Sequence, residues 1–91
     1  MAARKIEPLY YAMVRLFTDG HERSVHDVVK ELKPIYGDYK MLTFKYMEEA
    51  LATAKENGLL DETGYAVDEN KLIVRYLISE FGSKMVDRYL S

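Results

Sequence analysis

The sequence contains no cysteine, so the chain can form neither a disulfide framework nor a thiolate metal site, and it has no thiol nucleophile. This absence fits a cytoplasmic protein. No apolar run approaches the roughly 18 residues that a membrane-spanning helix requires, and the first residues lack the apolar segment of a signal peptide. We therefore expect a soluble chain that is neither exported nor inserted into a membrane.

Signatures of catalysis are missing too. The sequence has no glycine-rich phosphate loop, no G-x-S-x-G elbow and no plausible Ser-His-Asp set. The two histidines, His21 and His26, are five residues apart beside Glu22 and Asp27, a spacing that fits no standard metal site. We expect no enzyme, no metal and no cofactor.

A strong positive charge is missing as well. Thirteen Lys and Arg against fifteen Asp and Glu give a formal net charge of -2, so the chain as a whole lacks the electrostatic footprint of an avid nucleic-acid binder. Residues 1–45 carry eight basic and six acidic side chains, whereas residues 46–91 carry five and nine. Any surface that faces phosphate should therefore lie in the first half.

Apolar residues are abundant. They make up 48% of the chain, with eight tyrosines and three phenylalanines, which is enough to form one core in a single domain over residues 1–91. The hydrophobic periodicity predicts a mainly α fold with a small β-hairpin. The expected elements are helices over 8–19, 24–33 and 39–57, a hairpin over 59–67, and a last helix over 69–90 that Gly82 and Ser83 can kink.

The first two helices have clear boundary signals. Pro8 suits the first position of a helix, and Gly20 suits the position just past a helix end. Ser24 followed by Asp27 is an N-terminal capping pattern. Pro34 is expected to end the second helix, because a proline in a helix interior removes a hydrogen bond.

The second half has signals of the same kind. Asp38 is a plausible cap for the third helix, which Gly58 should end in a left-handed turn. Two short apolar runs around Gly64 indicate a hairpin. Asp68 is expected to cap the last helix, whose apolar side chains leave few positions for water.

This order of elements resembles the winged helix-turn-helix family. The closest local similarity is residues 46–60, YMEEALATAKENGLL, which looks like the family's recognition helix running into the first wing strand. The resemblance implies a three-helix core, a two-stranded wing and an extra C-terminal helix. It also implies sequence-specific binding of double-stranded DNA by a small transcription regulator, with the start of the third helix in the major groove.

That docking mode implies which side chains touch DNA. Base edges would be read by Tyr39, Lys40, Met41, Phe44 and Lys45, and the phosphate contacts would be Ser24, His26, Lys30 and Lys33. Two other interpretations stay open. The lysines are equally well explained as ordinary solvated charges, and tyrosines at helical spacing often lie at the edge of a core.

The last helix predicts association of two copies. Its residues Leu72, Tyr76, Tyr89 and Leu90 are apolar on faces that do not cover the domain, and a two-fold homodimer would bury them. Alternatively, the first and last helices share one larger monomer core.

Two features favour a different function. The hairpin over 59–67 is acidic where a DNA-contacting wing is usually basic, and the connection between the second and third helices is longer than the family's tight turn. The alternative is a winged helix used as a protein-protein interaction module without DNA binding. Phosphate-driven binding depends steeply on salt, whereas an apolar interface does not, so the two are distinguishable.

Overall fold

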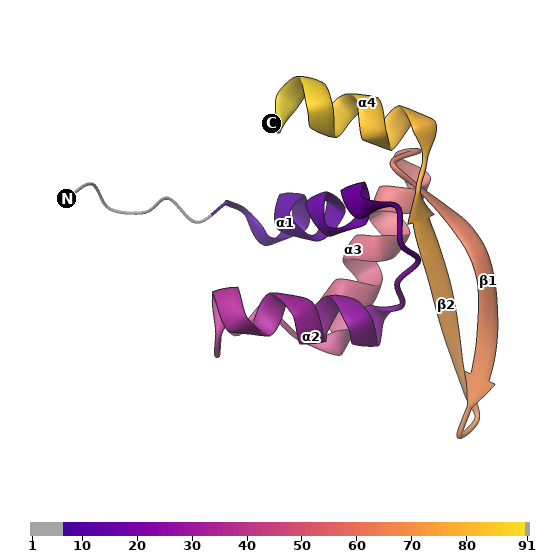
Figure 1. Ribbon diagram of the computed structural model, residues 1–91. Coiled ribbons are helices and arrows are strands. Elements are labelled where there is room, and N and C mark those ends of the chain that lie inside the picture. The colour runs from indigo at the N-terminus through magenta and orange to yellow at the C-terminus, as the bar shows by residue number, and fades with distance from the viewer. Residues whose placement is uncertain (1–6, 91) are drawn as a thin grey trace.

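The computed structural model describes residues 7–90. Its elements are helix α1 (Leu9–Leu16), the 3₁₀ turn η1 (Phe17–Asp19), helices α2 (Val25–Tyr36) and α3 (Phe44–Glu56), strands β1 (Leu60–Asp68) and β2 (Lys71–Ile78), and helix α4 (Glu80–Tyr89). The strands form a two-stranded antiparallel sheet that extends beside the helices, and α4 packs against α1 (Figure 1). The fold is mainly helical with a small hairpin.

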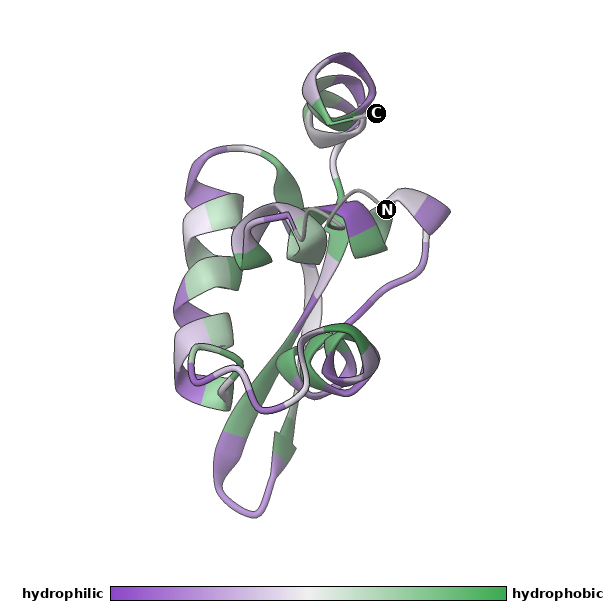
Figure 2. Ribbon diagram, turned by 90° about the vertical axis from the view of Figure 1, so that its left-hand side faces the viewer, coloured by the Kyte–Doolittle hydropathy of each residue, from purple (hydrophilic) through white to green (hydrophobic). Residues whose placement is uncertain are grey.

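The core lies between the first three helices and the base of the hairpin. Figure 2 shows the helices with their hydrophobic sides turned inward and their hydrophilic sides outward, as expected of amphipathic helices. The largest fully buried side chains are Phe17, Met13, Leu32, Met47, Leu51 and Leu60.

Three predicted helix boundaries are confirmed. Gly20 and Gly58 have φ angles of 83° and 80° at the ends of η1 and α3, in the left-handed region that glycine adopts without strain. At the start of α2, the backbone N–H of Ser24 donates to the carboxylate of Asp27 over 2.9 Å, and the reciprocal bond completes a capping box.

The prediction that Pro34 ends the second helix is wrong, because α2 continues to Tyr36. A proline this close to a helix end removes only one hydrogen bond. The half-buried Tyr36 holds the last turn, since its hydroxyl donates to the carbonyl of Glu7 over 2.5 Å.

The third helix begins at Phe44, five residues later than residue 39, where the sequence predicted its start. Thr43, not Asp38, is the cap, and its hydroxyl accepts from the backbone N–H of Tyr46 over 3.1 Å. Leu42 precedes the cap and is buried in the same core as Met47, an arrangement that fixes the direction from which the chain enters a helix. Residues 37–43 form a loop.

The prediction of a helix over 69–90 is wrong in its first half. Residues 71–78 form strand β2 instead, which pairs along β1 from Leu60 opposite Ile78 to Asp68 opposite Lys71. The hairpin therefore spans residues 60–78 and not 59–67. A mainly apolar run such as Leu72 to Ile78, interrupted only by Arg75, fits a buried helix and a strand equally well by periodicity.

The hairpin turn also lies elsewhere than predicted. Glu69 and Asn70 form it with φ angles of 49° and 66°, the left-handed geometry of a tight two-residue hairpin turn. Gly64 lies at an irregularity in the strand register, as a glycine at a β-bulge does. Asp68 is the last residue of β1 and caps no helix, and Gly82 lies inside the short helix α4.

Arg23 connects η1, α2 and β2. Its guanidinium donates to the carboxylate of Asp19 over 2.6 Å and to that of Glu31 over 2.9 Å, although its side chain is only 8% exposed. Its backbone exchanges two hydrogen bonds with Tyr76, of 3.0 and 2.9 Å. The chain between η1 and α2 is thereby attached to β2.

Helix α4 is attached at its first turn. The Ser79 hydroxyl donates to the Gly58 carbonyl over 2.5 Å and accepts from the Gly82 N–H over 2.8 Å. A Cβ on Gly82 would lie 2.0 Å from the carbonyl oxygen of Leu59. Glycine is therefore needed at position 82 because the helix touches backbone there.

The substitution Gly82→Ala tests this close contact. In an exposed helix, alanine is more favourable than glycine by roughly 1 kcal/mol. Here we expect the opposite sign, a loss of about 1–3 kcal/mol in the free energy of unfolding, because backbone must move. Urea denaturation measures it, with the exposed neighbour Ser83→Ala as a control. A Gly82→Ala protein as stable as the wild type would contradict the packing.

The contact between Arg23 and Asp19 predicts a pH dependence of stability. The hydrogen bond from Arg23, and then that from the backbone N–H of His21, hold the pKa of the Asp19 carboxyl well below its usual range. Its contribution to stability is therefore complete above about pH 4 and is lost as the pH falls below that value.

The variant Asp19→Asn should accordingly be less stable than the wild type at neutral pH, and the difference should shrink in acid. Urea denaturation between about pH 7 and 2.5 measures this difference across the relevant window. Asp61→Asn, on the exposed side of β1, is the control. A difference that stays constant with pH would show that Asp19 is not held by Arg23.

Candidate nucleic-acid interface

One end of the molecule is formed by α2, the 37–43 loop and the first turn of α3. The five residues predicted to read bases are all exposed there. Three of them, Tyr39, Lys40 and Met41, belong to the loop, and Phe44 and Lys45 open α3. The structure therefore presents this predicted set on one continuous segment, although the loop replaces the first part of the expected helix.

Phe44 contacts His26 across the two helices. The ring centroids are 4.9 Å apart and the rings are tilted by 54°, within the range of favourable aromatic pairs. Both residues lie in the first turn of their helix and both are exposed. The contact joins the starts of α2 and α3 while leaving one side of the phenylalanine open.

The cations divide into two groups. Within residues 7–90, Arg15, Arg23, Lys55, Arg75 and Lys84 each have a carboxylate oxygen within 4.0 Å. In the same range no carboxylate oxygen lies within 4.0 Å of the side-chain nitrogens of Lys30, Lys33, Lys40, Lys45, Lys71 and Arg88. All of this second group except Arg88 lie on α2, on the 37–43 loop, or at the start of α3 or β2.

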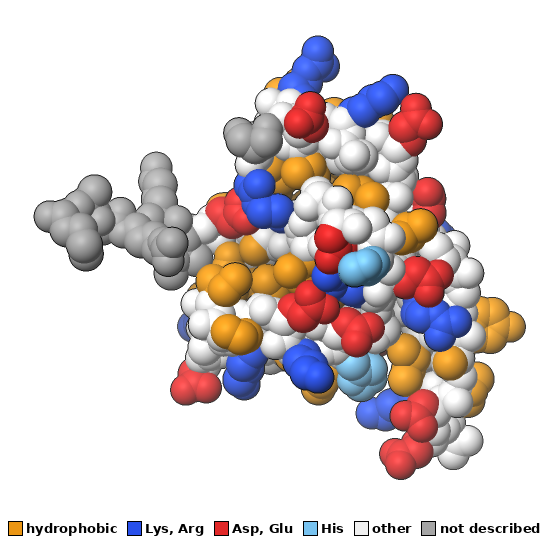
Figure 3. Space-filling view, in the orientation of Figure 1, with side chains coloured by type: hydrophobic (Ala, Val, Ile, Leu, Met, Phe, Trp, Pro, Cys, Tyr) orange, Lys and Arg blue, Asp and Glu red, His pale blue; other side chains and the backbone are white. Residues whose placement is uncertain are grey.

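The positive charge does not extend far. Glu48 and Glu49 are exposed one turn further along α3, and the hairpin turn carries Asp68 and Glu69. Figure 3 shows acidic and basic side chains interspersed over the visible face rather than one positive field. Apart from Arg88, the described cations without a carboxylate oxygen within 4.0 Å are therefore confined to α2, the 37–43 loop and the starts of α3 and β2.

Ser24 is not available as the predicted phosphate contact. The residue is 7% exposed, and its backbone N–H is already bonded to Asp27. The Asp27 carboxylate occupies the positive end of α2, where a phosphate would otherwise bind. His26, Lys30 and Lys33, by contrast, are exposed as a contact surface requires.

A groove separates the hairpin from the starts of α2 and α3. It has a volume of about 430 Å³ and is lined by Val25, His26, Phe44, Glu48, Lys71, Leu72 and Ile73. Lys71 is the functional candidate that sequence reasoning missed. Lys71 lines the groove because residues 71–78 form a strand. A sequence analysis that assigned this strand correctly would have placed Lys71 beside α2 and α3.

The residues predicted to form a dimer interface do not share one surface. Leu72 and Tyr76 lie on β2, whereas Tyr89 and Leu90 lie at the end of the chain in and just after α4. Tyr76 is 8% exposed and belongs to the core. Figure 1 shows the hairpin turn and α4 at opposite ends of the molecule. An interface along one long helix is therefore ruled out.

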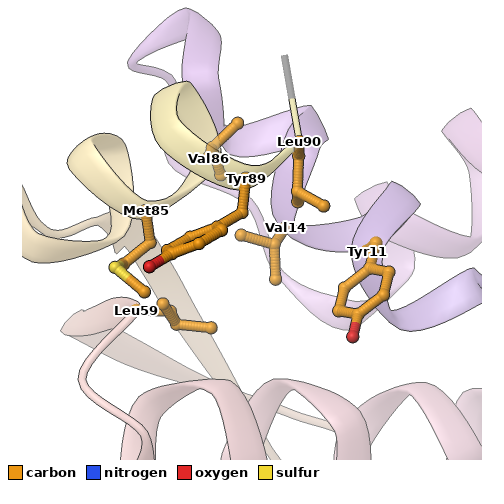
Figure 4. A pocket seen from close by; sticks show the side chains of 7 residues that line it. All are labelled: Tyr11, Val14, Leu59, Met85, Val86, Tyr89 and Leu90. Atoms are coloured by element: carbon orange, nitrogen blue, oxygen red, sulfur yellow. The ribbon is translucent and has the colours of Figure 1, made fainter.

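An apolar pocket of about 400 Å³ lies between α1 and α4 (Figure 4). It is lined by Tyr11, Val14, Leu59, Met85, Val86, Tyr89 and Leu90. Arg15 on α1 donates to the carbonyl of Leu90, directly after α4, and this bond links the two helices; it also donates to the Glu7 carboxylate, before α1, over 2.9 Å. This is the packing expected when the first and last helices share a monomer core.

The remaining findings add no known ligand or relative. Between residues 7 and 90, no group of three or more His, Asp or Glu side chains is placed to hold a metal ion. No helix in that range is long and apolar enough to cross a membrane. The chain matches no protein-family model, no curated protein and no solved structure. Its function therefore has to be argued from its own residues.

The structural role of Ser24 is testable. Ser24→Ala removes the capping hydroxyl and should lower the free energy of unfolding by about 1 kcal/mol. Ser24→Thr keeps a hydroxyl and serves as the control, with a smaller loss. Urea denaturation distinguishes the variants, and equal stability of Ser24→Ala and wild type would contradict the capping role.

Proposed function

We propose that this chain is a winged helix-turn-helix domain that binds duplex DNA as a small sequence-specific transcription regulator. Helices α2 and α3 are the helix-turn-helix pair, and the hairpin β1–β2 is the wing. One observation carries the proposal: the exposed loop and first turn of α3 combine apolar side chains with lysines that have no recorded carboxylate partner in the described chain.

The chemistry of the side chains indicates which residues contact phosphates and which contact bases. Lys30 and Lys33 are three residues apart on α2, so they lie on one face, and with Lys40 and Lys45 they can neutralise phosphates on either side of a groove. Phe44 is the first residue of α3 and precedes Lys45 in the chain. Its side chain carries no hydrogen-bonding atom, so it is suited to a base edge and not to a phosphate.

Docking is limited to the first turn of α3. Glu48 would repel phosphates if the helix entered the major groove deeply, because both carry negative charge. The wing turn, with Asp68 and Glu69, is unsuited to phosphate for the same reason. Arg75 on β2 is paired with Glu22, which leaves Lys71 as the wing cation without a carboxylate partner in the described chain. We therefore propose binding of moderate affinity that depends on a few phosphate contacts.

Homodimerisation through α4 remains part of the proposal in a changed form. Of the residues predicted to form a dimer interface, Tyr89 is the one that is exposed on α4. It borders the pocket between α4 and α1. A second copy that binds through α4 would contact this end of the molecule, opposite the wing turn.

A protein-interaction module is the second candidate. The exposure of Tyr39 and Phe44, and of Tyr65, Val67 and Leu72 on the hairpin, favours it, because exposed apolar surface commonly marks a protein contact. Such a module would bind its partner with little dependence on salt, unlike a protein that displaces counterions from DNA.

Fluorescence anisotropy with random duplex DNA at about 50 and 200 mM salt tests the proposal. The wild type should bind at the lower salt and largely dissociate at the higher. The double variant Lys40→Ala/Lys45→Ala should bind more weakly, and its slope of log affinity against log salt should fall by about 2.

The matched control is Lys55→Ala/Lys84→Ala, which removes the same charge from ion-paired positions outside the interface. This control should keep the wild-type slope. If both double variants titrate alike, the lysines at α3 do not contact DNA. If the wild type shows no salt-dependent binding, the protein-interaction module is the better proposal.

A further inference from the structure

The candidate interface is short of hydrogen-bonding side chains that read bases. Residues 39–53 contain no arginine, asparagine or glutamine, which together with lysine are the side chains that form paired hydrogen bonds with guanine or adenine in the major groove. The two lysines at its start are flexible and serve phosphates as well as bases. What this surface offers to a base edge is chiefly apolar.

Phe44 is the side chain best placed to make an apolar contact with a base edge. It is the first residue of α3, directly after the Thr43 cap, and is 48% exposed. His26 contacts its ring on one side, and a side chain that already has a packing partner loses less conformational freedom on binding. Lys45 follows it in the chain, and Lys71 lines the same groove together with Glu48.

We infer that Phe44 reads the 5-methyl group of thymine, so that the sites bound by this protein have thymine opposite the first turn of α3. The inference rests on the proposed function. The thymine methyl is the apolar group that base pairs present in the major groove, and phenylalanine is among the residues that contact it. Lys40 and Lys45, on the same loop and helix start as Phe44, favour an occupant that carries negative charge as well as a methyl group, and thymine-containing DNA carries both.

The experiment removes the methyl group without changing base pairing. A duplex is first selected from a random pool by binding to the wild-type protein, and each thymine is then replaced in turn by deoxyuridine. Burial of one methyl group contributes about 0.8 kcal/mol, or roughly fourfold in affinity. At one or two thymines, we expect deoxyuridine to weaken wild-type binding by about threefold to tenfold.

The variant Phe44→Ala should bind more weakly and no longer distinguish thymine from deoxyuridine at those positions. Phe81→Ala is the matched control, because Phe81 is 50% exposed on α4, outside the interface. This control should retain the full discrimination. Circular dichroism establishes that both variants are folded, and Phe44→Leu, which keeps an apolar side chain, should retain part of the discrimination.

The outcomes separate the two proposals. If a site is selected but no deoxyuridine substitution weakens binding, or if Phe44→Ala discriminates as well as the wild type, DNA binding stands and the role of Phe44 is wrong. If no duplex is bound in a salt-dependent manner, the proposed function fails and this inference fails with it.

Discussion

The guanidinium of Arg23 donates to the carboxylates of Asp19 and Glu31 and to the carbonyl of Leu16. Burying a guanidinium is costly unless its donors are satisfied, and these partners come from η1, α2 and the end of α1. The backbone of the same residue is paired with Tyr76 on β2. The hairpin is thereby fixed beside the start of α2, and the groove that holds His26, Phe44 and Lys71 follows from that placement.

The residues at the start of α3 determine which side chains are exposed at the candidate interface. Thr43 ends the 37–43 loop and starts α3, while the buried Leu42 attaches the loop to the core. Phe44 is consequently turned outward although it is apolar. The same arrangement places Lys45 beside it without a recorded carboxylate partner, so the chemistry of the candidate interface originates in the helix start.

Local signals made half of the structure predictable. The capping box at Ser24 and the left-handed Gly58 depend on neighbouring residues alone, and both were identifiable in the sequence. Strand β2 was not, because the mainly apolar run from Leu72 to Ile78 satisfies helix and strand patterns alike. Its conformation is decided by pairing with β1 and with Arg23, contacts between residues distant in the chain. Lys71 was missed, and Tyr76 misplaced, for this reason.

The central claim is that the α2–α3 end of the molecule contacts DNA. Amide chemical shifts of the ¹⁵N-labelled protein, recorded during titration with duplex DNA at low salt, locate the contact directly. We expect the largest changes in residues 39–45 and on the exposed face of α2 around Lys30 and Lys33, and their reversal as salt is added. Changes confined to α4 and α1, or none at all, would contradict the account.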